Sequence, residues 1–132
     1  MIGVDTNVLL RLYVSDEPQQ HETAIKFFAK RSEESPAYVS MVVLVEFVWA
    51  LTKTYDYGWN RVLSLVGAMI DLRDMVIERE EVVADALTRA LEEKVDFVDA
   101  IIARANADDG CMTTVTFDKR AAKRLASMEL LT

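Results

Sequence analysis

The chain has 132 residues, of which 52% are hydrophobic and 28% charged, with only four glycines and two prolines. This length and balance fit a single domain over residues 1–132, and they exclude a disordered chain, a collagen-like repeat and a disulfide-rich miniprotein. Fifteen Lys and Arg against 22 Asp and Glu give a net charge of −7, so a broad basic face for nucleic acid is not expected. Contact with a polyanion would need a bound divalent cation or a small local group of Lys and Arg.

The sequence shows no sign of a membrane or secretory protein. No apolar run is longer than that of Met41–Val45, far short of the roughly 20 residues that span a bilayer. The first residues lack the basic segment and apolar stretch of a signal peptide. Cys111 is the single cysteine and has no partner for an internal disulfide, which fits a reducing compartment. We therefore expect a cytoplasmic protein.

Short apolar strands alternate with amphipathic helices along the chain. One helix is expected to begin with Asp16 as its cap and Pro18 in its first turn, and to bury Ala24, Ile25, Phe27 and Phe28. In chain order, the patterns predict a strand at 1–5, helices at 6–14 and 16–31, a strand at 37–40, helices at 41–55 and 59–72, a strand at 75–78, helices at 80–93 and 96–107, a strand at 111–116, a helix at 118–126 and a strand at 129–131.

Strands separated by helices indicate parallel pairing with right-handed crossovers. The expected architecture is therefore α/β, with helices on both faces of an open sheet. Ligands of such sheets bind beyond the carboxyl ends of the strands. Polar residues at those ends are the candidate site.

Asp5 and Asp118 each follow a predicted strand and open a helix. Helix capping accounts for either residue, because Asp accepts hydrogen bonds from the free N–H groups of a first turn. Asp96 and Asp99 are spaced like a capping box, with Asp96 at the cap. Asp99 either completes this capping box or, because it opens the apolar stretch Ala100–Ala103, points inward toward the strand ends.

Glu46 is the single polar or charged residue between Met41 and Leu51. A carboxylate on so apolar a helix either reaches solvent or is neutralised by a cation, since a buried unpaired charge costs several kcal/mol. We favour the cation. Trp49, on the same helix, is expected in the core, and Trp59 is expected to pack at a helix start.

Together the acids point to a metal site. In a parallel sandwich, Asp5, Glu46, Asp99 and Asp118 would converge on one edge, where four carboxylates repel one another. Mg²⁺ or Mn²⁺ relieves such repulsion, and near a phosphodiester it activates water and stabilises the leaving oxygen. His21 lies far from these positions, which argues against a histidine general base.

Four motifs together resemble the PIN-domain ribonucleases, and most closely the VapC-type toxins of toxin–antitoxin pairs. The motifs are Asp5-Thr6-Asn7, Ser40 with Glu46, the run from Asp96 to Ala103, and Thr116-Phe117-Asp118. They occur in the family's order over nearly the whole chain.

The resemblance implies an α/β/α sandwich of three layers with a five-stranded parallel sheet. It implies an endoribonuclease that uses Mg²⁺ or Mn²⁺ to cleave tRNA or rRNA, forms a homodimer and is neutralised by a cognate VapB-like antitoxin. The family's catalytic and metal-binding acids fall on Asp5, Glu46, Asp99 and Asp118. Its supporting positions fall on Thr6, Asn7, Ser40, Asp96 and Thr116.

The basic residues Lys119 and Arg120 open the last predicted helix, where cations oppose the helix dipole. A solvated basic face accounts for them, and so does contact with the RNA backbone. Two other functional classes remain open for the chain. One is a metal-dependent phosphohydrolase, although Asn7 replaces the second Asp that a haloacid-dehalogenase-like enzyme needs. The other is a non-catalytic binding module, either receiver-like or a degenerate nuclease.

Overall fold

The computed structural model describes residues 1–132 as two compact units, unit 1 at Met1–Glu80 and unit 2 at Glu81–Thr132. Five strands and seven α-helices follow one another in the predicted order, with one short π-helix in addition. Every strand pair is parallel, as predicted. None of the helices has the length and apolar character needed to cross a membrane.

Unit 1 is built on a sheet of three short strands. They are β1 (Ile2–Gly3), β2 (Ala37–Val39) and β3 (Met75–Ile77), in the order β1-β2-β3. The register pairs Ile2 with Ala37, and Ala37 with Met75. Because the strands are parallel, their carboxyl ends lie at one edge of this sheet.

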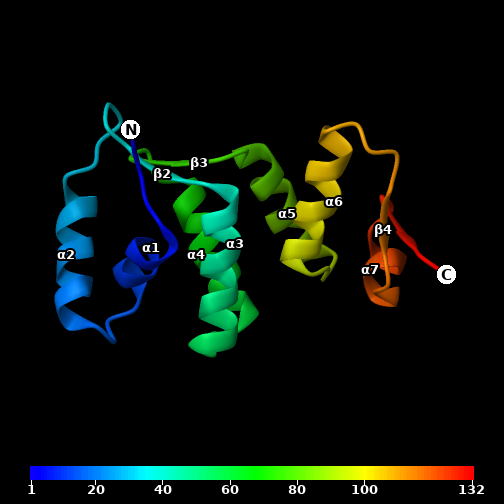
Figure 1. Cartoon of the computed structure of the whole chain (residues 1–132), viewed down its shortest axis with the longest axis horizontal. Helices are drawn as coiled ribbons and strands as arrows, with labels where there is room; N and C mark the ends of the chain where they lie inside the picture. The colour runs from blue at the N-terminus through cyan, green and yellow to red at the C-terminus, as the bar shows by residue number, and fades with distance from the viewer. The chain divides into compact units, whose positions relative to one another are not determined.

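Four α-helices complete unit 1: α1 (Thr6–Tyr13), α2 (Pro18–Ala29), α3 (Met41–Trp49) and α4 (Trp59–Ile70). Helix α1 packs against both α2 and α3 and lies between them in Figure 1. The helices bury apolar side chains such as Leu9, Leu44 and Val66, none of which is exposed. The ring of Tyr13 on α1 contacts that of Phe47 on α3, with their centroids 5.5 Å apart. Burial of these apolar groups is the main stabilising contribution.

The start of α2 differs from the prediction. Glu17, without a side-chain cap bond, precedes Pro18, and Asp16 does not cap the helix. The Asp16 carboxylate instead accepts hydrogen bonds from Arg11 Nη1 and from the Tyr55 hydroxyl, both at 3.0 Å. These tertiary partners compete with the local cap for the carboxylate. The buried face of α2 is also narrower than predicted, because Ile25 is 44% exposed. Ala24 is buried, as predicted, whereas Phe27 and Phe28 are half-buried.

The predicted helix 41–55 forms as α3 followed by the π-helix η1 (Ala50–Thr54). Its core face has the spacing i, i+3, i+4, i+7, with Leu44, Phe47, Val48 and Leu51 all buried. Trp49 lies off this face and is 53% exposed, so the expectation that it is a core residue is wrong. Trp59 does open a helix, α4, but it is 40% exposed.

Unit 2 comprises α5 (Glu80–Glu92), α6 (Phe97–Asp108), α7 (Lys119–Arg124) and the parallel strands β4 (Thr114–Thr116) and β5 (Met128–Leu130). Its interior contains the buried side chains of Val83, Phe97 and Leu125. Arg104 on α6 pairs with Asp85 on α5 at 3.3 Å, which links the two helices. The sequence predicted β4 as a longer strand, at 111–116, and β5 one residue later, at 129–131.

The single five-stranded sheet implied by the family resemblance is not what the strands form. They are hydrogen-bonded as a sheet of three, β1-β2-β3, and a sheet of two, β4-β5. Each strand has only two or three residues, so an apolar run predicts that a strand exists but says little about its neighbours. Pairing depends on contacts between residues far apart in the chain, which a three-residue pattern does not encode.

Candidate functional site

In unit 1, Asp5 follows β1 and is the N-cap of α1. Its Oδ1 accepts a hydrogen bond from the backbone N–H of Val8 at 3.0 Å, and its Oδ2 accepts none. The backbone of Asp5 is extended, as an N-cap requires. The capping role considered from sequence is therefore confirmed, and one carboxylate oxygen stays open to another partner.

The structure brings Glu46 to the same end of α1. Thr6, the first residue of α1, donates a hydrogen bond from Oγ1 to Glu46 Oε1 at 3.0 Å. Glu46 is exposed, because it lies off the buried face of α3, and its Oε2 accepts no hydrogen bond. Asn7 is also exposed in the first turn of α1. Thr6 thus orients the Glu46 carboxylate.

Two further polar residues lie at the carboxyl edge of the three-stranded sheet. Ser40, directly after β2, is the N-cap of α3 and accepts from Val43 N at 3.3 Å. Glu78, directly after β3, accepts a 2.7 Å hydrogen bond from the backbone N–H of Met41. Glu78 was not among the predicted site residues. Its place just after a strand was the available signal, and its role here is to satisfy the first turn of α3.

In unit 2, Asp96 and Asp118 are helix N-caps. Asp96 Oδ1 accepts from Asp99 N at 2.9 Å at the start of α6. Asp118 Oδ1 accepts from Arg120 N at 2.9 Å and from Ala121 N at 3.0 Å at the start of α7. Thr116 Oγ1 in turn accepts from Asp118 N at 3.0 Å, which fixes the backbone before the cap. Both capping roles weighed from sequence are confirmed.

Asp99 is half-buried, and its carboxylate accepts no hydrogen bond. Burial raises the pKa of this carboxyl above its ordinary value, and the negative charges of Asp96 and Asp118 raise it further. The Asp99 carboxylate is therefore close enough to those of Asp96 and Asp118 to be repelled by both. Neither Asp99 nor Asp118 is in a salt bridge with Lys or Arg of unit 2.

The donor chemistry fits a hard divalent cation. Each of the four predicted acids offers at least one carboxylate oxygen without a hydrogen bond, and Mg²⁺ and Mn²⁺ prefer such oxygens. Asp5 and Glu46 belong to unit 1, and Asp99 and Asp118 to unit 2. Within either unit, no group of three His, Cys, Asp or Glu side chains forms a metal site by itself.

The remaining candidates are placed as follows. Lys119 and Arg120 are exposed in the first turn of α7. The Nδ1 atom of His21, the single histidine, lies 2.6 Å from the backbone oxygen of Arg11, where it links α2 to α1. This contact gives His21 a structural role.

Comparison with known proteins defines the class to which this α/β chain belongs. The model of the PIN domain family matches residues 2–127, nearly the whole sequence. The chain belongs to the PIN domain family, a fold whose members are generally metal-dependent nucleases that use Mg²⁺ or Mn²⁺. No curated protein is similar enough to match the chain.

Proposed function

We propose that this PIN domain is a metal-dependent endoribonuclease whose cation is held by Asp5, Glu46, Asp99 and Asp118. The observation that carries the proposal is the family match over residues 2–127. The state of the four acids supports it, since each has an oxygen open to a cation and none is neutralised by Lys or Arg within its own unit. Helix capping alone does not account for the group, because Glu46 and Asp99 cap no helix and still have open, unpaired carboxylate oxygens.

The chain's own residues prepare the site in three ways. Backbone N–H groups hold one oxygen of Asp5 and of Asp118, so these carboxylates keep their orientation. Thr6 holds Glu46 in the same manner. Asp99 is half-buried, which strengthens its attraction to a cation. A divalent cation held by these groups would supply an activated water and would stabilise the charge that develops on the phosphate during hydrolysis.

We further propose a VapC-type toxin role, with tRNA or rRNA as the target, a VapB-like antitoxin and a homodimeric state. The support is the run of motifs from Asp5-Thr6-Asn7 to Thr116-Phe117-Asp118. The net charge of −7 suits an antitoxin with a basic segment. On α7, exposed Lys119 and Arg120 are suited to contact with the RNA backbone.

The decisive experiment compares RNA cleavage by the wild type and by Asp5→Asn. Asn keeps the cap on α1 but removes the charge that a cation needs. Asp71→Asn is the matched control. Asp71 is an exposed aspartate at the C-cap of α4, and it is not one of the proposed metal ligands. Each protein is incubated with total tRNA and with ribosomal RNA in Mn²⁺, in Mg²⁺ and in EDTA.

We expect discrete fragments from the wild type and from Asp71→Asn, and none from Asp5→Asn or in EDTA. Equal cleavage by all three proteins would reject the assigned site. A protein that binds neither Mn²⁺ nor Mg²⁺ and leaves both RNAs intact would be a binding module. A protein that binds the metal and hydrolyses small phosphate esters but not RNA would be the alternative phosphohydrolase. For the toxin role, we expect expression of the wild type, but not of Asp5→Asn, to arrest bacterial growth.

A further inference from the structure

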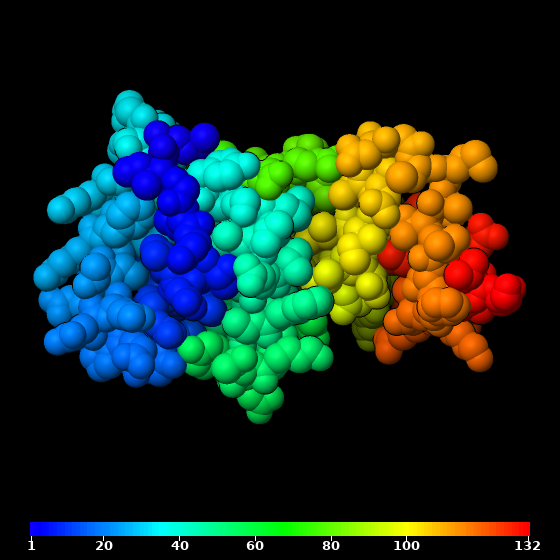
Figure 2. Space-filling view, viewed as in Figure 1, coloured from blue at the N-terminus to red at the C-terminus, as the bar shows by residue number.

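Unit 1 contains a cavity of about 590 Å³ between α1 and α2, beside the end of β1. Figure 2 shows the dark-blue start of the chain against the lighter-blue α2. The volume is in the range of pockets that hold small organic ligands. The cavity lining includes Asp5, Asn7, Arg11, Gln19, Gln20 and Phe27. Because Asp5 lines it, the cavity includes one of the two proposed metal-binding acids of unit 1.

Carboxamide side chains are the distinctive chemistry of this cavity. Asn7 and Gln19 are exposed, and neither side chain is in a hydrogen bond within the protein. Gln20 accepts from Arg11 Nε at 2.9 Å through Oε1, so its NH₂ group remains available. A carboxamide presents a donor and an acceptor side by side, which is the pattern that the edge of a nucleobase complements. Phe27 adds an aromatic wall.

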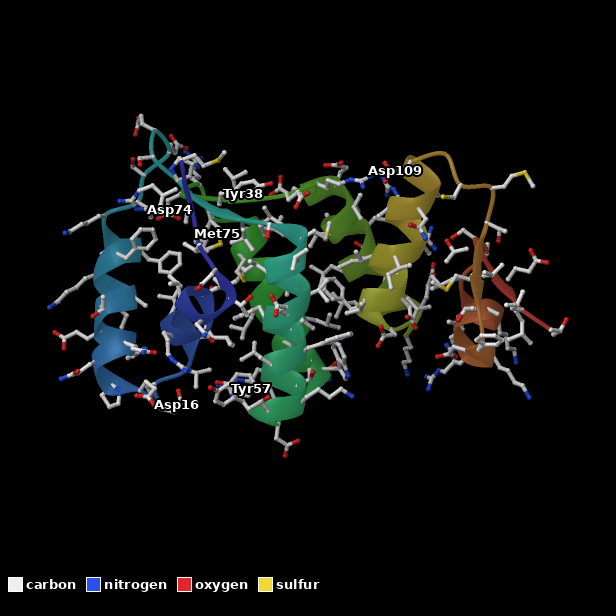
Figure 3. The ribbon with its side chains drawn as sticks, viewed as in Figure 1. Asp16, Tyr38, Tyr57, Asp74, Met75 and Asp109 are labelled. Atoms are coloured by element: carbon white, nitrogen blue, oxygen red, sulfur yellow. The ribbon has the colours of Figure 1, made fainter.

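A hydrogen-bond network holds Arg11, one of the residues that line the cavity. Its Nη1 donates to Asp16 Oδ1 and to the Tyr55 hydroxyl, both at 3.0 Å. Tyr55 also donates to Asp16 Oδ2. Asp16 lies where the chain passes from α1 to α2 (Figure 3). Since the charge of Arg11 is already paired with Asp16, the cavity is suited to an uncharged group rather than to a phosphate.

We propose that this cavity binds the nucleobase of the RNA residue next to the cleaved phosphate, and so contributes to the choice of cleavage site. The inference rests on the proposed ribonuclease function, because Asp5 belongs to both the cavity and the acidic site. Single-stranded RNA is recognised through bases turned out of the stack, placed against aromatic rings and hydrogen-bonded along their edges. The carboxamides supply the edge contacts, and Phe27 supplies an apolar surface.

The test uses the four ribonucleosides, which carry no phosphate, with the full chain in EDTA. Binding is followed by two-dimensional NMR of the backbone and Gln side-chain amides. Thr23→Trp fills the cavity from α2, because Thr23 lines it. Ile25→Trp is the matched control, since Ile25 lies on the same helix, is 44% exposed and does not line the cavity. The melting temperature of each variant verifies its folding.

We expect at least one nucleoside to shift the signals of Val8, Gln19 and Gln20. Thr23→Trp is expected to weaken that binding by about tenfold or more, and Ile25→Trp by less than about twofold. The proposal is overturned if no nucleoside shifts these signals, or if both variants bind as tightly as the wild type. An equal loss in the two variants also overturns it. Because the assay needs neither metal nor cleavage, the two proposals fail separately. A protein that binds a nucleoside but leaves RNA intact would refute the nuclease proposal and the choice of cleavage site, and would keep the cavity as a nucleobase site.

Discussion

Replacing Asp118 separates its capping role from its proposed metal-binding role. Asp118 Oδ1 accepts two backbone hydrogen bonds at the start of α7, a helix of six residues that is too short to be stable by itself. Asp118→Ala removes both bonds and should lower the free energy of unfolding by about 1 kcal/mol, or roughly 4 °C in melting temperature. Asp118→Asn keeps the cap and should lie within a few tenths of a kcal/mol of the wild type in EDTA.

Mn²⁺ should separate the wild type from Asp118→Asn, whose free energies of unfolding should be similar in EDTA. At a hundred times its dissociation constant, a cation that binds only the folded protein adds about 2.7 kcal/mol. The wild type should gain this stabilisation, and Asp118→Asn should lose most of it. Thermal melting by circular dichroism in EDTA and across a Mn²⁺ series measures both effects, with Asp71→Asn as the control. Either of two results would contradict these roles of Asp118. In one, Asp118→Asn destabilises the protein in EDTA as much as Asp118→Ala does; in the other, Asp118→Asn keeps the full Mn²⁺ shift.

Three other outcomes are expected. Phe47→Ala should cost about 3–5 kcal/mol in urea unfolding, because Phe47 is fully buried, whereas Trp49→Ala on the same helix should cost much less; equal losses would contradict the assignment of the core face. The pKa of Asp99 is raised in the folded state, so the folded protein keeps this proton at pH values above the ordinary pKa of 3.8, where the unfolded chain has lost it. The free energy of unfolding in EDTA should therefore fall as the pH rises from 3.8 through the raised pKa of the folded state. Asp99→Asn should abolish this fall, and an unchanged pH profile would count against the burial argument. Replacing Lys119 and Arg120 together with Ala should weaken RNA binding. It should also make the slope of log affinity against log salt shallower by about 0.7 for each phosphate that the variant no longer neutralises. Lys30→Ala, at the exposed C-cap of α2, should not reproduce this effect.

The sequence predicted the elements well because their signals are local. Helix periodicity and capping chemistry depend on neighbours within about four residues, and Asp5, Asp96 and Asp118 are all caps. Strand direction was also predictable, since helices between successive strands favour parallel pairing through crossovers. The four candidate acids came from a pattern of motifs, and their joint role in metal binding remains a proposal.

The errors arose where distant residues decide the outcome. Asp16 has the local signature of a cap, but Arg11 and Tyr55 take its carboxylate. Trp49 belongs to an apolar segment, yet the face of α3 that meets the core excludes it. The division of the strands into sheets of three and two depends likewise on long-range pairing. Such partners are set by the tertiary fold, which one sequence pattern does not contain.

Asp5 and Asp118 are helix caps and proposed metal ligands at once, and this combination affects how the chain can evolve. Each aspartate codon is a single nucleotide change away from an asparagine codon, and asparagine still closes the first turn of α1 or α7. Mutation can therefore silence the proposed enzyme without unfolding it. A lineage can keep the folded domain, with every surface that a partner recognises, long after its chemistry is gone. Loss of activity and loss of the protein are separate genetic events in this fold.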